Sequence, residues 1–285
     1  MITTTEFRNG HHITKGSGEN VYKGVLEHLP PPTPITSIED AAEQMHKDGC
    51  VQFPDLLSQA EVAEMRAWMD SQGGPDSEYE MKNWCFNKHI GADFTKDARW
   101  LKLIDRSPAW DVLNLILGEN FIVAGGSLWI TGRGRGMGIH LDHLAIGLPQ
   151  DVLEDERVRV PIFTGTLHYY LDDQVEEIGP TLLIPGSHRA GHAPHNEPTW
   201  GGRPPRMISV KAGGAVLFRH DLWHGAAMNT SNRRRYMIQV HYAEGSRRLP
   251  CPPITQPEAY HPSVLENITP RQRVLLGDKP KGIFY

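Results

Sequence analysis

Apolar residues recur at helical spacing in the first part of the chain. IEDAAEQMHKDG (38–49) and AEVAEMRAWMDSQ (60–72) place apolar side chains three and four residues apart, which is the pattern of a helix with one buried face. Both segments follow a serine that has an acidic residue three positions later, the spacing of a capping box: Ser37 with Asp40, and Ser58 with Glu61. Two helices are therefore predicted, and Gly49 closes the first.

A third helix is expected between Ser107 and Gly118. Ser107 is a suitable N-cap, Pro108 suits the first helical position, and a glycine commonly ends a helix. Between the first two helices, CVQFPDLL (50–57) is typical of a short strand followed by a turn.

From residue 121 onward the pattern changes to short runs of β-branched and aromatic residues. The predicted strands are FIVAGGSLWIT (121–131), VPIFTGTLHYYL (160–171), PTLLIPG (180–186), MISVKAGGAVLF (207–218) and YMIQVHYA (236–243). Glycine, proline and charged turns separate them, which indicates an antiparallel sandwich or barrel. The expected fold class is therefore mainly β with flanking helices.

A proline-rich stretch separates the N-terminal residues from this pattern. LPPPTPI (29–35) holds four prolines in seven positions, which predicts an extended arm over residues 1–36. All-β folds of this size commonly form one unit, so residues 37–285 are expected to form a single domain.

The composition points to a globular protein that binds a small molecule. Hydrophobic residues make up 39% and charged residues 22%, which is ordinary for a chain with a full core. The net charge of −5 comes from acidic and basic residues mixed throughout, which argues against a nucleic-acid-binding face or a membrane anchor. Nothing in the sequence indicates the oligomeric state.

The expected location is the cytoplasm. The first residues, MITTTEFRNGHHITKG, lack the apolar run of a secretory signal, and no segment approaches the roughly 18 apolar residues of a membrane span. The cysteines are odd in number and far apart, as is typical of reduced thiols: Cys50, Cys85 and Cys251.

The segment GIHLDHLAIG (138–147) places His140 and Asp142 two residues apart. On a strand, such side chains project from the same face while Leu141 points away. An imidazole nitrogen with a carboxylate oxygen suits a divalent metal such as Fe(II), and one more histidine would complete a facial triad with open coordination positions. His224 is the best candidate for that histidine and His220 is its competitor. A surface ion pair or a capped turn would equally explain an isolated H-x-D.

Several separate segments resemble the phytanoyl-CoA dioxygenase family of Fe(II)- and 2-oxoglutarate-dependent oxygenases. KDGCVQFPDLLSQAEVAEMR (47–66) resembles the family's opening helix, strand and helix, and HLD (140–142) resembles its H-x-D. LDDQVEEIGPTLLIPGSHR (171–189) resembles its long turn and strand ending in PGSH. HGAAMNTSNRRRYMIQVHYA (224–243) resembles its distal histidine followed by an arginine.

The resemblance implies a double-stranded β-helix, a jelly roll of two facing sheets with iron near one open end. His140, Asp142 and His224 then become the ligands by position. Arg235, eleven residues beyond the distal histidine, is expected to pair with the far carboxylate of 2-oxoglutarate, because a guanidinium supplies a bidentate fork. Its neighbours able to substitute are Arg233 and Arg234. The implied cofactors are Fe(II), 2-oxoglutarate and O2.

One position departs from the family's pattern. The family often carries a hydroxyl two residues after the distal histidine, where this chain has Ala226. The candidates to bind the cosubstrate carboxylate in its place are Thr131, Thr181 and His168. Ordinary sheet threonines and a hydrogen-bonded core histidine would explain these residues as well.

The implied reaction is oxidation of an unactivated C–H bond of a small molecule, by hydroxylation or by oxidative cyclisation or desaturation. A tailoring step on a natural product or a sugar is the expected role. Two alternatives are a jelly-roll hydrolase or isomerase that uses the same three ligands, and a non-catalytic binding relative. The first would have no use for Arg235 at this spacing, and the second would be expected to lose metal ligands.

Overall fold

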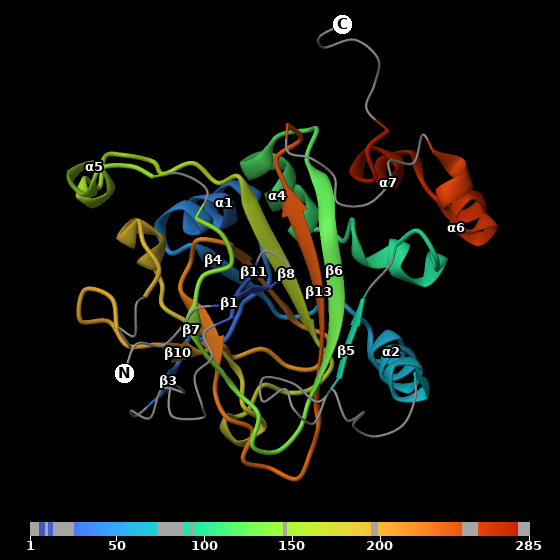
Figure 1. Cartoon of the computed structure of the whole chain (residues 1–285), viewed down its shortest axis with the longest axis horizontal. Coiled ribbons are helices and arrows are strands. Elements are labelled where there is room, and N and C mark those ends of the chain that lie inside the picture. Colours follow the sequence, from blue (N-terminus) through green and yellow to red (C-terminus); the bar gives the residue numbers. More distant parts are fainter. Residues whose placement is uncertain are drawn as a thin grey trace, which may run out of the picture.

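The computed structural model describes residues 6–8, 11–13, 26–72, 88–91, 94–144, 147–194, 199–246 and 256–278. Two facing β-sheets form its centre (Figure 1). The first sheet has the strand order β4-β11-β8-β13-β6-β5, and the second has the order β3-β10-β9-β12-β7. Neighbouring strands are antiparallel throughout, except that β10 and β3 are parallel. The double-stranded β-helix predicted from the resemblance is confirmed.

The six-stranded sheet consists of β4 (Cys50–Phe53), β5 (Lys88–Gly91), β6 (Ile122–Thr131), β8 (Thr164–Tyr170), β11 (Ala215–Arg219) and β13 (Arg235–Ala243). The five-stranded sheet consists of β3 (Glu27–His28), β7 (Met137–His140), β9 (Thr181–Leu183), β10 (Arg206–Met207) and β12 (His224–Ala226). A separate antiparallel pair is formed by β1 (Glu6–Arg8) and β2 (His11–Ile13).

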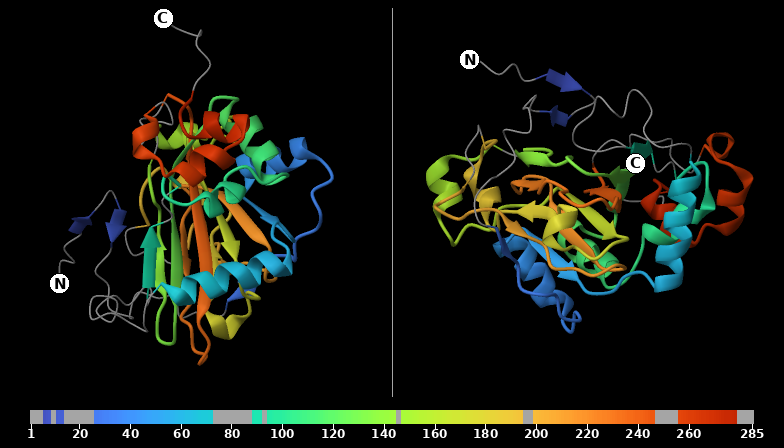
Figure 2. Two further views of the ribbon diagram at one scale, coloured as in Figure 1. Left: turned by 90° about the vertical axis from the view of Figure 1, so that its right-hand side faces the viewer. Right: turned by 90° about the horizontal axis from the view of Figure 1, so that it is seen from below.

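The helices are α1 (Ile38–Lys47), α2 (Gln59–Ser71), α4 (Ala109–Leu117), α5 (Gln150–Glu154), α6 (Pro262–Asn267) and α7 (Pro270–Leu275). Short 3₁₀ helices are η2 (Ala98–Leu103), η3 (Glu176–Ile178), η4 (Ser187–Ala190) and η5 (Pro257–Ala259). In Figure 1, α2, α6 and α7 lie to the right of the six-stranded sheet and the labelled strands of the five-stranded sheet lie to its left. Figure 2 gives the same arrangement from the side and from below.

The two faces of the six-stranded sheet have different neighbours. Its outer face and the helices share one large apolar cluster, which includes Met45 of α1, Met65 of α2 and Val264 of α6. Its inner face meets the five-stranded sheet in a smaller cluster that includes Tyr170, Phe218 and Leu183. Because side chains alternate along a strand, β4, β6, β8, β11 and β13 each have side chains at both clusters.

The strand predicted over 207–218 is wrong as a single element. β10 ends at Met207 in the five-stranded sheet and β11 begins at Ala215 in the six-stranded sheet, so the chain crosses between sheets within this apolar run. Gly213 makes the turn with a φ of +96°, and a Cβ there would lie 2.5 Å from the carbonyl oxygen of Leu57. Glycine therefore fits this turn, both by its backbone conformation and by its lack of a side chain.

The first two helices begin at the predicted serines, but only the second has a capping box. The Glu61 N–H donates to Ser58 Oγ at 3.3 Å, and the Ser58 N–H donates to the Glu61 carboxylate at 2.9 Å. At the first helix the Asp40 N–H donates to Ser37 Oγ at 3.0 Å without a return bond. A capping box uses glutamate or glutamine in the third position, and aspartate is one methylene shorter.

The N-cap predicted at Ser107 is wrong. Helix α4 begins at Ala109, with Pro108 in the capping position and no side-chain hydrogen bond there. The predicted end at Gly118 is confirmed. Helices α5, α6 and α7 were not expected, since all the predicted helices lie in the first part of the chain.

The division into an arm over 1–36 and a domain over 37–285 stays a prediction. Within the predicted arm, β3 pairs with β10 at the edge of the five-stranded sheet. In the part of the chain that the structure describes, no helix has the length and apolar character needed to cross a bilayer. The cytoplasmic location also stays a prediction.

Candidate active site

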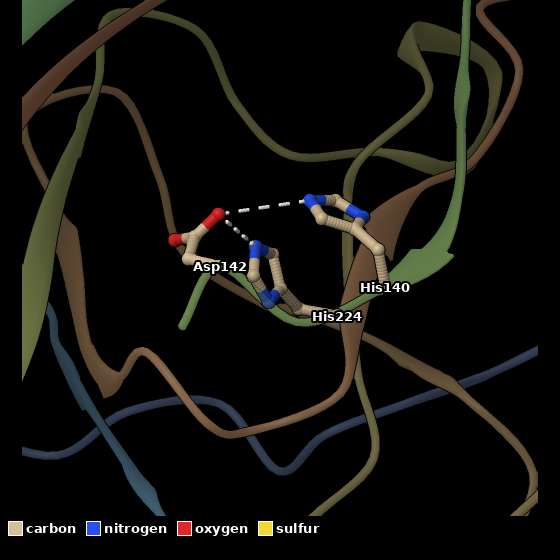
Figure 3. A group of neighbouring side chains, drawn as sticks. All are labelled: His140, Asp142 and His224. Carbon is tan, nitrogen blue, oxygen red and sulfur yellow. Dashed lines mark ion pairs between the residues drawn. The ribbon is translucent and has the colours of Figure 1, made fainter. Parts of the chain in front are cut away.

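Three side chains converge between the ends of β7 and β12 (Figure 3). His140 is the last residue of β7, His224 is the first of β12, and the strand register pairs them directly. The Nε2 atoms of His140 and His224 lie 3.8 and 3.7 Å from Oδ1 of Asp142. The ligand atoms of the three side chains all lie within 4.8 Å of one another, which is the arrangement of a group able to share one metal ion.

Both histidines are oriented by hydrogen bonds through their other ring nitrogen. Nδ1 of His140 lies 2.9 Å from the carbonyl oxygen of Gly138, and Nδ1 of His224 lies 2.9 Å from that of Leu222. Because a carbonyl only accepts, each Nδ1 carries the proton and each Nε2 keeps its lone pair directed toward Asp142. Metal-binding histidines are typically held in this way.

Asp142 reaches the group from a bend and not from a strand. β7 ends at His140, and the N–H groups of Asp142 and His143 both donate to the carbonyl of His220, at 2.9 and 3.2 Å. Leu141 is buried in a separate apolar cluster. His140 and Asp142 therefore point to the same side, as predicted, but Asp142 does so from beyond the strand, where two hydrogen bonds attach the chain to the β11–β12 turn.

The absence of a side chain at Gly225 lets β7 and β12 approach closely. A Cβ at this position would lie 2.7 Å from the carbonyl oxygen of Met137 and 2.9 Å from that of Gly138. The register of the two strands also shifts between His224 and Ala226. This close contact keeps the two histidine rings 4.3 Å apart, measured between centroids.

The surroundings of Asp142 keep it a carboxylate. Burial alone would raise its pKa, but the imidazoles of His224, His220, His140 and His241 hold the pKa well below its usual range. A carboxylate oxygen close to two imidazole nitrogens suits a divalent cation.

His220 lies outside the three-residue group. Its Nε2 is 3.3 Å from Nδ1 of His241 on β13, and burial lowers its pKa to about 3. Among the residues that the structure describes, the group able to hold a metal contains His224 and not His220. The choice of His224 over its competitor is therefore favoured by the geometry.

Arg235 is a buried cation with unused hydrogen-bonding capacity. It is 3% exposed, its Nη1 donates to the carbonyl of Gly179, and its Nε has no partner. Burial lowers its pKa. In the strand register it pairs with Thr131, whose buried Oγ1 also lacks a partner. Arg233, by contrast, is exposed and lies 3.9 Å from Glu177.

Thr181 carries a hydroxyl on β9, directly across from Ala226 of β12. The register of β9 and β12 pairs the two residues directly, so the hydroxyl that is missing at Ala226 has a counterpart across the strand pair. The hydroxyl of Tyr170 donates to Thr181 Oγ1 at 2.8 Å.

His168 is buried, and Phe218 packs between it and His224 of the three-residue group. Its ring packs edge-on against Phe218 at 4.7 Å between centroids, and Phe218 lies 4.7 Å from the ring of His224. Nδ1 of His168 is 3.4 Å from the Tyr170 hydroxyl, and its Nε2 is 3.0 Å from Nε2 of Gln239. Tyr170 and Gln239 were not predicted from the sequence. Counting in steps of two along β13 from Arg235 would have found Gln239.

The expected reduced thiols are only partly described. Cys50 is a buried free cysteine, and burial raises the pKa of its thiol to about 12. Cys85 and Cys251 lie outside the described residues.

Comparisons with known proteins agree with this geometry. The family model described as phytanoyl-CoA dioxygenase (PhyH) matches residues 45–237. Dioxygenase af480 of Aspergillus fumigatus is 25% identical over 256 residues, which cover 84% of this chain and 77% of the relative.

Solved structures share the fold. SnoN, a non-heme alpha-ketoglutarate-dependent epimerase from nogalamycin biosynthesis, superposes with a TM-score of 0.55 at 17% identity, covering 73% of this chain and 80% of its own. HygX from Streptomyces hygroscopicus, crystallised with nickel and 2-oxoglutarate, gives 0.55 at 17% identity, with 74% and 88% covered. Because the family model spans more than half of the sequence, the chain belongs to the phytanoyl-CoA dioxygenase (PhyH) family of Fe(II)- and 2-oxoglutarate-dependent oxygenases.

Proposed function

We propose that His140, Asp142 and His224 bind Fe(II), that Arg235 binds the far carboxylate of 2-oxoglutarate, and that the enzyme oxidises a C–H bond of a small molecule. The observation that carries this proposal is the convergence of the three ligand atoms within 4.8 Å of one another. Two imidazole nitrogens and one carboxylate oxygen are the donor set of non-haem Fe(II) oxygenases.

The buried polar atoms around Arg235 fit a dicarboxylate. The Nε of Arg235 and the Oγ1 of Thr131 are buried without a hydrogen-bond partner. Such atoms lower the stability of the fold unless a ligand forms hydrogen bonds with them. A carboxylate accepts two parallel N–H bonds from one guanidinium. Thr131, Thr181 and His168 are accordingly proposed to surround the cosubstrate, the first two through their hydroxyls.

The side chains of this site have separate tasks. When bound, Fe(II) and 2-oxoglutarate supply with O2 the oxidising power that C–H cleavage requires, and the cosubstrate leaves as succinate and carbon dioxide. His140 and His224 present Nε2, while Asp142 supplies the anionic ligand. Because Asp142 occupies its own coordination position, it leaves no vacancy for chloride, and halogenation is not the proposed outcome.

The proposed substrate is a small organic molecule, in a tailoring step on a natural product or sugar. Trp129, Gln239 and His241 are only partly buried although they belong to the inner face of the six-stranded sheet. Aromatic and uncharged polar side chains of this kind suit a ring with oxygen substituents. The epimerase SnoN, which has the same fold, belongs to the biosynthesis of nogalamycin.

Anaerobic titration of 2-oxoglutarate into the Fe(II)-loaded protein tests the proposal. The keto acid chelate is expected to give a visible charge-transfer band, which His224→Ala should abolish. Arg235→Ala should need far more 2-oxoglutarate, while the matched control Arg233→Ala should behave as wild type because its side chain is exposed. A metal-dependent hydrolase with the same three ligands would give no such band. Absence of the band in the wild-type protein, or equal affinity in Arg235→Ala, would contradict the proposal.

A further inference from the structure

A row of hydrogen-bonded side chains crosses the inner face of the six-stranded sheet. Gln239 of β13 pairs in register with His168 of β8 on one side and with Ser127 of β6 on the other. Its Nε2 lies 3.0 Å from Nε2 of His168, and its Oε1 lies 2.8 Å from Oγ of Ser127. Ser127 also lies 2.6 Å from Nε1 of Trp129. The row therefore runs without a break across three strands.

The donors and acceptors of this row all point in one direction. The indole N–H of Trp129 only donates, and it donates to Ser127 Oγ. The Ser127 hydroxyl in turn donates to the amide oxygen of Gln239. The amide nitrogen of Gln239 consequently faces β8 and donates to Nε2 of His168.

His168 passes this direction on to Thr181. A histidine that accepts at Nε2 carries its proton on Nδ1 when it is neutral, and burial lowers the pKa of His168 well below its ordinary value. Its Nδ1–H faces the Tyr170 oxygen at 3.4 Å, the longest link of the row. The Tyr170 hydroxyl then donates to Thr181 Oγ1 at 2.8 Å. Among the described residues, no acceptor takes the proton of the Thr181 hydroxyl.

The end of the row lies beside Arg235. The guanidinium donates to the carbonyl of Gly179, two residues before Thr181, and its charge acts on the Tyr170 hydroxyl. An oxygen that receives one hydrogen bond and keeps its own proton is suited to donate to an anion held by that arginine.

We propose that Gln239 is a positioning residue, which acts through His168 and Tyr170 to direct the Thr181 hydroxyl proton toward the carboxylate held by Arg235. This inference rests on the proposed function, because the carboxylate is that of 2-oxoglutarate. The orientation of one amide on β13 thus sets the donor available on β9.

Replacement of Gln239 by glutamate should reverse the direction of the hydrogen bonds from His168 to Thr181. A carboxylate has no proton to donate, so it accepts from Ser127 on one side and from His168 Nε2–H on the other. Nδ1 of His168 then becomes an acceptor for Tyr170, and Tyr170 becomes an acceptor for Thr181. The Thr181 hydroxyl then donates to Tyr170 and no longer donates to the cosubstrate.

The tautomer of His168 tests this direction without iron or turnover. Long-range proton–nitrogen NMR of the metal-free, histidine-labelled protein is expected to find the proton on Nδ1 in the wild type and on Nε2 in Gln239→Glu. A wild-type His168 that carries its proton on Nε2 would overturn the inference, as would a tautomer that is unchanged in the variant.

The affinity for 2-oxoglutarate tests the consequence, measured anaerobically with Fe(II) as the loaded metal. Thr181→Val and Gln239→Glu are each expected to weaken binding by about tenfold, since each removes one hydrogen bond to a charged group. The double variant should bind no more weakly than Thr181→Val alone, because both changes remove the same donor. Two effects that multiply would overturn the inference.

Gln52→Glu is the matched control for the added charge. Gln52 lies on β4 of the same sheet, and its amide bonds to Pro30 and Ser209, outside the row. Its affinity for 2-oxoglutarate should equal that of the wild type, and a tenfold loss there would attribute the Gln239→Glu effect to charge and overturn the inference. Failure of the wild-type protein to bind 2-oxoglutarate would instead contradict the proposed function, whatever the tautomer of His168.

Discussion

Alternate side chains of β13 face two different environments. Those of the outer face are fully apolar or aromatic and are buried beneath the helices: Tyr236, Ile238, Val240 and Tyr242. Those of the inner face include a cation, an amide and an imidazole: Arg235, Met237, Gln239 and His241. Gln239 and His241 stay partly exposed, although β13 has a neighbouring strand on each side.

The outer face of β13 stabilises the fold, whereas its inner face has side chains available for binding. The outer face has the composition and burial of a hydrophobic core. The inner face contains buried polar atoms without partners, at Arg235 and Thr131, and such atoms reduce stability until a ligand satisfies them. Substitutions on the outer face should therefore change the free energy of unfolding, and those at the proposed site should change ligand binding.

The largest expected effect comes from Asp142→Ala. Loss of the anionic ligand should reduce succinate formation from 2-oxoglutarate to the level of iron-free protein, while the circular dichroism spectrum stays native, because the side chain contributes nothing to the apolar clusters. Succinate formation at wild-type rates in the folded variant would remove Asp142 from the proposed site.

Ile238→Ala should lower stability without changing 2-oxoglutarate binding. Ile238 is fully buried in the outer cluster, so its truncation should lower the free energy of unfolding by about 2–5 kcal/mol. Denaturant unfolding measures this loss. The affinity of the folded variant for 2-oxoglutarate should stay at the wild-type value, and a large loss of affinity would show that the two faces are not independent.

Arg235→Ala should weaken 2-oxoglutarate binding by about a hundredfold, since truncating one partner of a buried, hydrogen-bonded charge pair costs about 2–5 kcal/mol. In thermal unfolding of the iron-loaded, oxygen-free protein, 2-oxoglutarate should raise the Tm of the wild type, because a ligand that binds only the folded state stabilises it. The same concentration should leave the Tm of Arg235→Ala nearly unchanged. Equal shifts in both proteins would mean that the cosubstrate does not use this guanidinium.

The smallest expected effect is that of Ser58→Ala. Ser58 forms the capping box of α2, on the outer side of the six-stranded sheet, and its loss should lower the free energy of unfolding by about 1 kcal/mol. Ser37→Ala offers a comparison, because the first helix lacks the return bond. We expect the smaller loss at Ser37, again by denaturant unfolding.

Local patterns in the sequence predicted the three longest strands, β6, β8 and β13, and the first two helices. β6, β8, β9 and β13 all lie within or beside the predicted runs, because β-branched and aromatic residues report directly on sheet structure. The run over 207–218 was wrongly predicted as one strand, because its apolar residues are continuous in sequence although they belong to two different sheets. The short helices α6 and α7 were missed although each has a proline in its first turn, and α7 also has a capping box of Thr269 with Gln272.

The proposed site was predictable where it depends on residue type and not where it depends on register. His140 and Asp142 followed from ligand chemistry, and the family resemblance added Arg235 and selected His224 over His220. The pairing of Thr181 with Ala226 depends on how β9 and β12 align, which the sequence does not state. The row through Gln239 likewise requires the register of three strands.

The inner side of the jelly roll is proposed to bind Fe(II) through three side chains and 2-oxoglutarate through Arg235. An oxygen-free crystal structure with both ligands, measured at the iron absorption edge, tests it most directly. We predict a single anomalous peak bounded by His140 Nε2, Asp142 Oδ1 and His224 Nε2, with the cosubstrate extending to the Arg235 guanidinium. A peak at another position, or a cosubstrate that does not contact Arg235, would contradict this assignment of the ligands.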